Sequence, residues 1–190
     1  MKIYYIMGKS ASGKDTLFLK LLEEVKGLKK LVPYTTRPMR VGEEEGAEYK
    51  FIDEATMDAF RADGKVIEER TYETERGPWT YATIDDGRIN LDRHNYLAIG
   101  TLESYKKIKE FFGEDRVFPI YLVVDSGIRL QRALNRERMQ EEPQYDEMCR
   151  RYLADEEDFC DEKVREVGIA KSYLNDDLVA CLEEILKDMV

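Results

Sequence analysis

The first residues of the chain contain the pattern that most restricts how it can fold. Residues 1–7 form an apolar run rich in β-branched and aromatic side chains, which predicts a buried strand. The segment GKSASGKDT follows at once and spans Gly8 to Thr16. From Thr16 onward the apolar residues recur with helical spacing, and Gly27 is a plausible end for that helix. A strand, a glycine-rich turn, a lysine and a helix in this order predict a phosphate-binding P-loop.

The residue types of this loop suit a phosphate for physical reasons. Gly8 and Gly13 allow the backbone to curl so that its N–H groups point inward and form an anion nest. The start of the helix adds unpaired N–H groups and the positive end of its dipole. Lys14 adds a mobile positive charge for the outer phosphates. We therefore expect the whole loop to bind phosphate, through Gly8, Lys9, Ser10, Ala11, Ser12, Gly13, Lys14, Asp15 and Thr16. A glycine- and serine-rich turn before an ordinary helix is the alternative.

Composition excludes some classes of function. The chain has 190 residues with 30 Lys and Arg against 40 Asp and Glu, a formal net charge of -10, which argues against a general nucleic-acid binder. No apolar run approaches the roughly 20 residues that span a bilayer, and no signal-peptide pattern precedes the first strand. We therefore expect a cytoplasmic protein without a membrane partner. His94 is the only histidine, so the chemistry is expected to depend on charge stabilisation rather than on a histidine relay.

The alternation of apolar strands and helices predicts an α/β fold with a doubly wound parallel sheet, whose ligands bind at the carboxyl ends of the strands. Residues 35–84 differ from the rest and predict a small mixed insert that is mostly β. Strands are expected at 49–52, 66–72, 79–84, 96–99, 118–124 and 172–174, with a short extended segment at 31–34 and a turn at 73–78. Helices are expected at 54–62 with Asp53 as its cap, at 101–112, from 126 onward, at 144–159, and from 178 near the chain end.

Arginines gather in two places. Arg37 and Arg40 lie with Tyr49 in a loop, where guanidinium groups and a phenol could hold a phosphate. A solvated loop with internal ion pairs is the alternative there. Arg132 and Arg136 are spaced i, i+4 and share one face of the helix after residue 126, and Arg129 can lie on that side too. Beside a P-loop, such arginines could stabilise the charge of a transferred phosphoryl group, and ordinary surface salt bridging is the alternative.

A set of motifs in this order resembles the guanylate kinase family over nearly the whole chain. The most specific part is TTRPMRVGE, from Thr35 to Glu43, continuing through Gly46 to Tyr49. The other parts are Gly8 to Thr16, Val66-Ile67-Glu68, Tyr81-Ala82-Thr83, Arg132 with Arg136, and Asn175-Asp176-Asp177-Leu178. The resemblance implies one domain over 1–190. In it, 1–34, 85–125 and 161–190 form the P-loop core, 35–84 the GMP-binding insert, and 126–160 a helical lid with the helix that follows it.

The resemblance also implies an activity and roles for residues. The family transfers the γ-phosphoryl of ATP to GMP or dGMP with Mg²⁺ and yields ADP and GDP or dGDP. By resemblance, Lys14, Arg37, Arg132, Arg136 and Arg151 are catalytic, and Asn175 lies beside the adenine. The substrate-binding set is Arg37, Arg40, Glu43, Tyr49, Glu68, Tyr81 and Thr83. Of these, Glu68 would accept from N1–H and the 2-amino group of guanine, and Thr83 would donate to O6. Because adenine lacks that donor pair, it would leave Glu68 unpaired.

One departure from the family concerns the metal. Members usually carry Asp-x-Asp at the strand end before the second core helix, but this chain has Leu97-Ala98-Ile99-Gly100. Asp15 meanwhile occupies the P-loop position whose hydroxyl normally touches magnesium. We therefore expect Asp15 to be a Mg²⁺ ligand that restores negative charge from the other side. The alternative is that Asp15 only favours the helix N-terminus electrostatically.

Two other functions stay open. The GKD ending of the loop also resembles ribose 1,5-bisphosphate phosphokinase, so the acceptor could be another small phosphorylated molecule. A non-catalytic guanylate-kinase-like binding domain is the third possibility, although Lys14 and both loop glycines argue against an eroded P-loop. For either kinase function the partners are small molecules, namely ATP and the phosphate acceptor. We expect a monomer or a homodimer.

Overall fold

The computed structural model describes residues 1–40, 42–74 and 77–189. Val41 of the TTRPMRVGE motif and residues 75–76 of the expected turn at 73–78 lie outside the described residues. None of the helices in the described ranges combines the length and the apolar character that crossing a bilayer requires.

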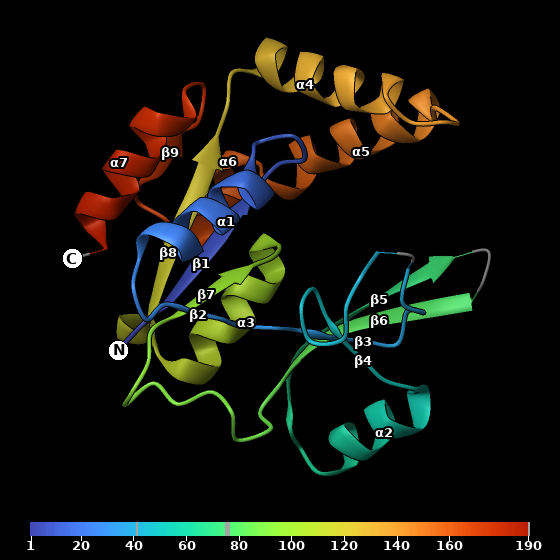
Figure 1. The fold of residues 1–190 in the computed structure, drawn as a ribbon, viewed down its shortest axis with the longest axis vertical. Coiled ribbons are helices and arrows are strands. Elements are labelled where there is room, and N and C mark those ends of the chain that lie inside the picture. Colours follow the sequence, from blue (N-terminus) through green and yellow to red (C-terminus); the bar gives the residue numbers. More distant parts are fainter. Residues whose placement is uncertain (41, 75–76, 190) are drawn as a thin grey trace.

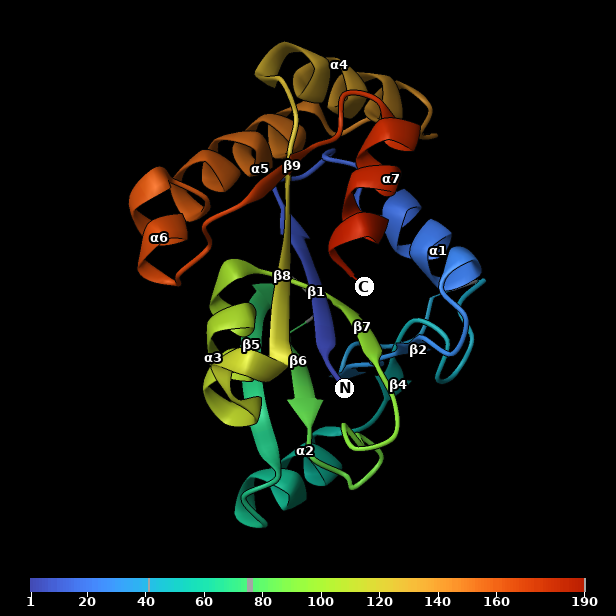
Figure 2. The ribbon, with the colours of Figure 1, turned by 90° about the vertical axis from the view of Figure 1, so that its left-hand side faces the viewer.

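A five-stranded parallel sheet forms the centre of the molecule, in the order β2-β7-β1-β8-β9 (Figures 1 and 2). The central strand β1 is buried along its whole length, as its apolar sequence predicts. The sheet confirms the expected α/β fold, with β1 at Ile3–Gly8, β2 at Lys29–Lys30, β7 at Tyr96–Ile99, β8 at Val117–Val123 and β9 at Ser172–Leu174.

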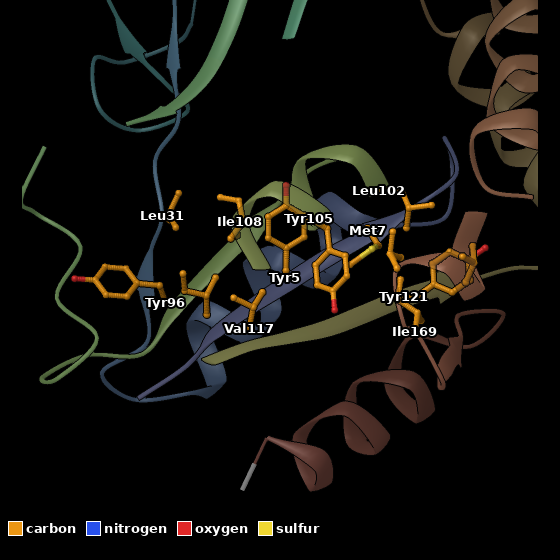
Figure 3. Close-up of a cluster of buried hydrophobic side chains, with 14 of the residues drawn as sticks. Tyr5, Met7, Leu31, Tyr96, Leu102, Tyr105, Ile108, Val117, Tyr121 and Ile169 are labelled. Atoms are coloured by element: carbon orange, nitrogen blue, oxygen red, sulfur yellow. The ribbon is translucent and has the colours of Figure 1, made fainter. Parts of the chain in front are cut away.

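Helices cover both faces of this sheet. Tyr4 and Ile6 point to the face covered by α1 (Lys14–Glu24) and α7 (Leu178–Asp188). Ile3, Tyr5 and Met7 point to the opposite face, where α3 (Leu102–Phe112) and α6 (Asp161–Glu166) pack. Successive residues of a strand point to opposite faces, so one short strand supplies the centre of both cores. Figure 3 shows the second of these cores, with Tyr5 beside Tyr105.

A second, mixed sheet of four strands is built by the segment after α1, in the order β4-β3-β6-β5. Its strands are β3 (Tyr34–Thr35), β4 (Lys50–Phe51), β5 (Val66–Thr74) and β6 (Gly77–Ile84). Only the β3–β4 pair is parallel. Helix α2 (Glu54–Ala62) has the predicted bounds, and the Asp53 side chain accepts from the backbone N–H of Thr56 at 2.8 Å. The buried Met57 packs this helix against the sheet.

Two helices, α4 (Ser126–Arg138) and α5 (Tyr145–Asp158), form a hairpin beyond the carboxyl end of β8 (Figure 1). Asp125 caps α4 by accepting from the N–H groups of Gly127 and Ile128. The short 3₁₀ helix η1 (Glu114–Arg116) precedes β8. In the described part of the chain, the α4–α5 hairpin therefore lies beyond the carboxyl end of the parallel sheet, and the mixed sheet lies beside it (Figure 1).

The structure differs from the expectations in a few places. Helix α1 begins at Lys14 rather than Thr16, and it ends at Glu24, where Val25 is already extended. The extended segment expected at 31–34 lies between two short strands, since β2 ends at Lys30 and β3 begins at Tyr34, and the Leu31 N–H still donates to the Leu97 carbonyl of β7 at 2.9 Å. The six-residue helix α6 was not expected, since a highly charged segment of that length shows no helical period.

Candidate active site

The P-loop lies between β1 and α1 and requires its two glycines. Gly8 and Gly13 have φ of 153° and 86°. A Cβ at Gly8 would lie 2.6 Å from the carbonyl oxygen of Leu122, and one at Gly13 would lie 2.4 Å from Asn175 Nδ2. Ala11 is the one non-glycine residue of the described ranges with a positive φ, at 63°. The backbone curl predicted for the anion nest is therefore present, and it leads directly into α1.

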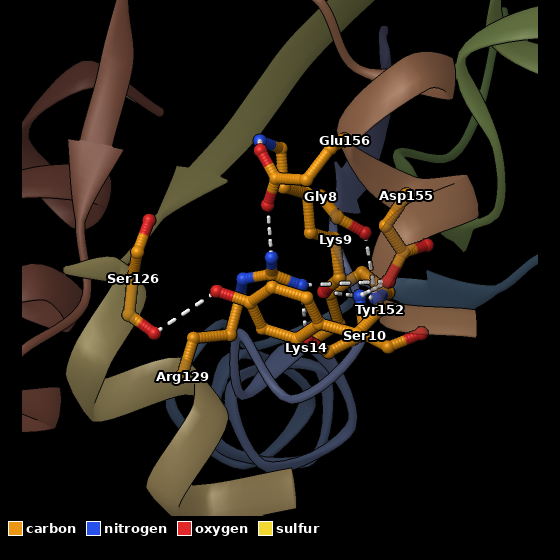
Figure 4. Close-up of polar contacts among 9 residues, drawn as sticks. All are labelled: Gly8, Lys9, Ser10, Lys14, Ser126, Arg129, Tyr152, Asp155 and Glu156. Carbon is orange, nitrogen blue, oxygen red and sulfur yellow. Dashed lines mark hydrogen bonds and ion pairs between the residues drawn. The ribbon is translucent and has the colours of Figure 1, made fainter. Parts of the chain in front are cut away.

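Lys14 turns back over this curl. Its Nζ donates to the carbonyl oxygens of Gly8 at 2.7 Å and Lys9 at 3.0 Å (Figure 4). Burial lowers the pKa of Lys14 and nearby arginines add to this, whereas Asp15 and Asp155 oppose it. The ammonium is thus held at the mouth of the nest by weak backbone partners, from which it can move to a phosphate.

Carboxylates from α5 occupy the outer side of the loop. Asp155 Oδ2 accepts from the backbone N–H of Ser10 at 2.7 Å, and Glu156 Oε2 lies 2.5 Å from Lys9 Nζ (Figure 4). These acidic groups come from residues about 145 positions later in the sequence, and sequence reasoning missed them. The run Asp155-Glu156-Glu157 is the only sequence signal, and it is also that of an ordinary solvated helix face.

Arg129 of α4 joins the same cluster. It is 1% exposed, its guanidinium lies 3.6 Å from the ring centroid of Tyr152, and it pairs with both Asp155 and Glu156. Its NH1 also reaches the carbonyl oxygen of Ser10 at 3.5 Å. Tyr152 is fixed in turn by its hydroxyl, which donates to the carbonyl oxygen of Ser126 at 3.1 Å. Of the α4 arginines, Arg129 therefore makes the hydrogen bond to the P-loop.

The predicted arginines of the lid and its following helix make different contacts. Arg132 donates to the carbonyl oxygens of Asn175 and Asp176 at 3.0 and 3.2 Å, in the segment after β9. Arg136 lies close enough to Lys14 to add to the lowering of its pKa, which burial causes mainly. Arg151 Nε donates to Glu147 at 2.6 Å on its own helix.

Asn175 is built into the floor of the loop. It is 2% exposed, and its Nδ2 donates to the carbonyl oxygen of Ser12 at 2.7 Å. The structure therefore joins this predicted ligand residue to the P-loop backbone itself.

Arg37 and Glu43 form a second charged cluster in the mixed sheet. The Arg37 guanidinium is bidentate to Glu43, at 3.0 and 2.7 Å, and Arg37 is 3% exposed. These hydrogen bonds, with one from the backbone N–H of Arg40, lower the pKa of Glu43 to about 2. The Tyr49 ring lies 5.4 Å from the Arg37 guanidinium and 5.5 Å from the Tyr81 ring. The predicted phosphate-binding side chains are thus neighbours, except that the Arg40 side chain is exposed.

Glu68 and Thr83 face each other across β5 and β6. Thr83 Oγ1 donates to Glu68 Oε1 at 2.9 Å, and the Glu68 side chain is 1% exposed. Its other oxygen, Oε2, lies 3.2 Å from Arg70 Nε without hydrogen-bond geometry. Burial raises the pKa of Glu68, while Arg70 and Thr83 oppose the shift. Sequence reasoning missed Arg70, although its place two residues after Glu68 on a strand puts both on one face.

The strand end that lacks the expected carboxylates is filled by other groups. A Cβ at Gly100 would lie 2.1 Å from the Tyr5 hydroxyl and 2.8 Å from Ser104 Oγ. These two oxygens are 2.5 Å apart, so a buried tyrosine–serine hydrogen bond takes the place of a side chain at position 100. Burial raises the pKa of the Tyr5 hydroxyl, which therefore stays neutral.

The described residues contain no group of three or more His, Cys, Asp or Glu side chains that could hold a metal by themselves. Asp15 is exposed in the first turn of α1, next to Lys14. Mg²⁺ in phosphoryl-transfer sites usually takes one or two carboxylates and completes its shell with substrate phosphates and water. A single open carboxylate beside the phosphate nest fits that donor set.

Comparison with known proteins agrees with this geometry. A family model described as guanylate kinase matches residues 1–187. Guanylate kinase from Nitrobacter winogradskyi is 32% identical over 138 residues, covering 70% of this chain and 59% of that protein. The one from Legionella pneumophila (strain Paris) is 42% identical over 66 residues, or 35% of this chain and 32% of that protein. The aligned segments thus span less than two thirds of these relatives.

The fold has a solved counterpart. The crystal structure of guanylate kinase from Anaplasma phagocytophilum superimposes with a TM-score of 0.67 at 20% identity, covering 99% of this chain and 84% of the other. At that identity the similarity shows the fold. Because the family match extends over residues 1–187, however, this chain belongs to the guanylate kinase family.

Proposed function

We propose that this chain is a nucleoside monophosphate kinase that transfers the γ-phosphoryl of ATP to GMP or dGMP, yielding ADP and GDP or dGDP. The observation that carries the proposal is the Glu68 carboxylate, which is 1% exposed and has one oxygen without a hydrogen-bond partner among the described residues. Its neighbour there is Arg70 Nε, an ion-pair partner at 3.2 Å without hydrogen-bond geometry, so this oxygen can still accept from the N–H groups of a ligand. Guanine supplies two such donors, N1–H and the 2-amino group.

In the proposed function, the two nucleotides bind at different sheets. ATP binds at the core, formed by 1–34, 85–125 and 161–190, and GMP binds at the insert 35–84. The segment 126–160 acts as the lid with its following helix. In this scheme, one domain over 1–190 brings the two phosphates into line when the α4–α5 hairpin and the insert approach each other.

On the donor side, the backbone N–H groups of residues 8–16 hold the phosphates and Lys14 neutralises the outer ones. Arg132, Arg136 and Arg151 place positive charge over the transferred group as a GMP phosphate oxygen attacks and ADP leaves. Charge on the equatorial oxygens is stabilised by these fixed cations, and the reaction needs no covalent intermediate on the protein. Asn175, which holds the Ser12 carbonyl, supports the loop next to the adenine.

On the acceptor side, Arg37, Arg40, Tyr49 and Tyr81 hold the GMP phosphate. Glu43 is proposed to act as a stand-in, since its carboxylate pairs with Arg37 in the bidentate manner in which a phosphate would. The phosphate displaces it on binding. Glu68 and Thr83 read the base.

The donor set around Asp15 leads us to propose Mg²⁺ as the cofactor supplied with ATP. When bound, the ion would neutralise the β- and γ-phosphate oxygens. Asp15 would hold it together with those oxygens. We expect Asp15→Ser to raise sharply the magnesium concentration that gives half-maximal rate, with the maximal rate recovered at high magnesium. An unchanged magnesium dependence would leave Asp15 with only an electrostatic role at the helix N-terminus.

The acidic composition and the absence of a nucleic-acid motif fit an enzyme of free nucleotides, which we place in the cytoplasm as a monomer or homodimer. A coupled ADP-release assay with ATP and magnesium, comparing GMP, dGMP, AMP, UMP and ribose 1,5-bisphosphate, tests the function. Turnover with GMP and dGMP alone is expected. Turnover with the sugar phosphate but not with GMP would mean that the sugar phosphate is the acceptor. The GKD ending of the P-loop, with Asp15 in place of Ser or Thr, favours that alternative. Nucleotide binding without turnover of any acceptor would indicate a binding domain.

A further inference from the structure

Arg70 is a largely buried charged residue of the insert to which the proposed function gives no role. It follows Glu68 by two positions on β5, so both side chains leave the same face of the strand. Its guanidinium reaches across to the core, where NH1 donates to Thr101 Oγ1 at 3.2 Å. The side chain is 18% exposed, and its Nε is buried without a hydrogen-bond partner among the described residues.

The hydrogen bond to Thr101 does not by itself explain this placement. Thr101 already caps α3 in a reciprocal capping box with Ser104, so the helix start needs no further hydrogen bond. A cation at a helix N-terminus is also disfavoured by the helix dipole. The bridge to Thr101 therefore fixes the direction of the guanidinium, whose Nε forms an ion pair with Glu68 Oε2 at 3.2 Å that lacks hydrogen-bond geometry.

In this structure, Thr83 does not supply the hydrogen-bond donor that O6 of guanine needs. A threonine hydroxyl carries one proton, and the Thr83 proton is directed at Glu68 Oε1. While that proton stays on Glu68, Thr83 takes part in reading the base only through the carboxylate that it orients, and it does not donate to O6. The adjacent donor is Arg70, whose Nε lies 3.2 Å from Glu68 Oε2.

The order of these groups matches the order of groups along one edge of guanine. Glu68 Oε1, Glu68 Oε2 and the Arg70 guanidinium follow one another, as the 2-amino group, N1–H and O6 do. We propose that Arg70 is a specificity-determining residue that donates to O6 of the acceptor base while Glu68 accepts from N1–H and the 2-amino group. Arginine is a frequent partner of guanine O6 and N7 for the same geometric reason. The inference rests on the proposed function and assigns it a further residue.

The pair discriminates against adenine at two points. Adenine presents an unprotonated N1 to the Glu68 carboxylate and a 6-amino donor to the Arg70 guanidinium, so both contacts become repulsive. Arg70 also supports Glu68 electrostatically. Burial raises the pKa of Glu68 and the Arg70 charge opposes that shift, which favours the ionised form that can accept from two donors.

The test uses acceptors that each change one group of the base. GMP has all three groups, IMP keeps O6 and N1–H but lacks the 2-amino group, and 6-thio-GMP keeps N1–H and the 2-amino group but has sulfur, a weak acceptor, in place of O6. We expect Arg70→Ala to lower kcat/KM for GMP and IMP by about 10–100-fold and to change it less than about threefold for 6-thio-GMP. Arg70→Lys should restore part of the loss. Arg61→Ala, which removes an ion-paired arginine of the same insert, is the matched control.

Two further measurements separate the possible failures. Calorimetric binding of GMP and IMP to the wild type and to Arg70→Ala reports on recognition even without turnover, and urea unfolding checks that the variant is folded. An equal loss for all three nucleotides, or no loss for any, overturns the role of Arg70. If the wild type neither binds nor phosphorylates GMP, the proposed function fails and this inference fails with it. If the wild type uses GMP and only the Arg70 prediction fails, the proposed function stands.

Discussion

The P-loop and the base-reading site, which consists of Glu68, Thr83 and Arg70, differ in whether their charged groups have hydrogen-bond partners within the protein. At the P-loop, Lys14 is bonded to loop carbonyls, the Ser10 N–H to Asp155, and Lys9 to Glu156. At the base-reading site, Glu68 Oε2 and Arg70 Nε face each other at 3.2 Å, and neither has a hydrogen-bond partner among the described residues. The cationic groups of the P-loop are thus hydrogen-bonded within the protein, although the neutral atoms Ser12 Oγ and Asn175 Oδ1 are buried there without a partner among the described residues. At the base-reading site the two atoms without a hydrogen-bond partner belong to the charged groups themselves.

The difference follows from what holds the groups. The acidic partners at the P-loop, Asp155 and Glu156, lie on α5 of the α4–α5 hairpin, far from the loop in the sequence. Glu68 and Arg70 lie two residues apart on β5, and their ion pair of 3.2 Å lacks hydrogen-bond geometry. In the proposed function, ATP phosphates therefore displace internal carboxylates, whereas the groups that select the base are already in place. Arg37 with Glu43 belongs with the P-loop in this respect, because a loop carboxylate satisfies it.

The largest effect on activity is expected from Lys14→Ala, which removes the positive charge of Lys14 from the P-loop. Lys14→Ala removes the charge that stabilises the outer phosphates in the transition state, and we expect kcat to fall by about 10²–10³-fold. Lys20→Ala is the matched control, because Lys20 lies on the same helix with an exposed ion pair to Glu23. Steady-state kinetics with ATP and GMP measure both. Activity retained in Lys14→Ala would remove the P-loop from the chemistry and leave it a structural turn.

A smaller effect, in this case a gain in ATP binding, is expected when the Asp155 carboxylate beside the P-loop is neutralised. Asp155→Asn keeps an oxygen for the Ser10 N–H but removes the negative charge that competes with the ATP phosphates. We expect the KM for ATP to fall about two- to fivefold, which corresponds to about 0.5–1 kcal/mol for a partly exposed charge. Asp158→Asn, on the exposed end of the same helix, should change nothing. A higher KM in Asp155→Asn would instead make Asp155 a ligand-binding group.

The regular elements could be predicted because their causes are local. The bounds of α2 follow from the Asp53 cap and a clear helical period, and β7 follows from four apolar residues between polar segments. The P-loop is local too, since its spacing and glycines lie within nine residues. Helix α6 was missed because a short charged helix is held by tertiary packing of Val164 rather than by its own sequence pattern.

The partners within the site could not be predicted, because they depend on distant segments. The i, i+4 spacing of Arg132 and Arg136 shows that they share a face, but not which face meets the P-loop. The structure buries Arg129, which was expected to be able to lie on that side too, against Tyr152 at the P-loop, and Arg136 lies close enough to Lys14 to affect its pKa. Asp155 meets Ser10 across 145 residues, and Arg70 meets Thr101 across 31, so neither contact has a sequence period. Residue types and spacing thus predict the chemistry of a site, while the tertiary fold decides its partners.

The smallest effect concerns the Arg37–Glu43 pair and depends on pH. Hydrogen bonds from Arg37 lower the pKa of Glu43 to about 2, below the roughly 4.3 of an unfolded glutamate. A carboxyl whose pKa falls on folding stabilises the protein above its unfolded pKa, and this contribution is lost as pH falls through about 2. Glu43→Gln should therefore lower the free energy of unfolding by a constant amount at pH 6–8, and the difference should shrink between about pH 5 and pH 2.

Urea unfolding across this pH range measures the effect, with the exposed Glu44→Gln of the same loop as the control. The same variant tests the substitute-anion role. A neutral amide competes less well for the Arg37 guanidinium, so Glu43→Gln should bind GMP more tightly even though it is less stable at neutral pH. Stability and affinity would then move in opposite directions, as expected of a carboxylate that a phosphate displaces. A loss of both would instead mean that Glu43 holds Arg37 in place for the substrate.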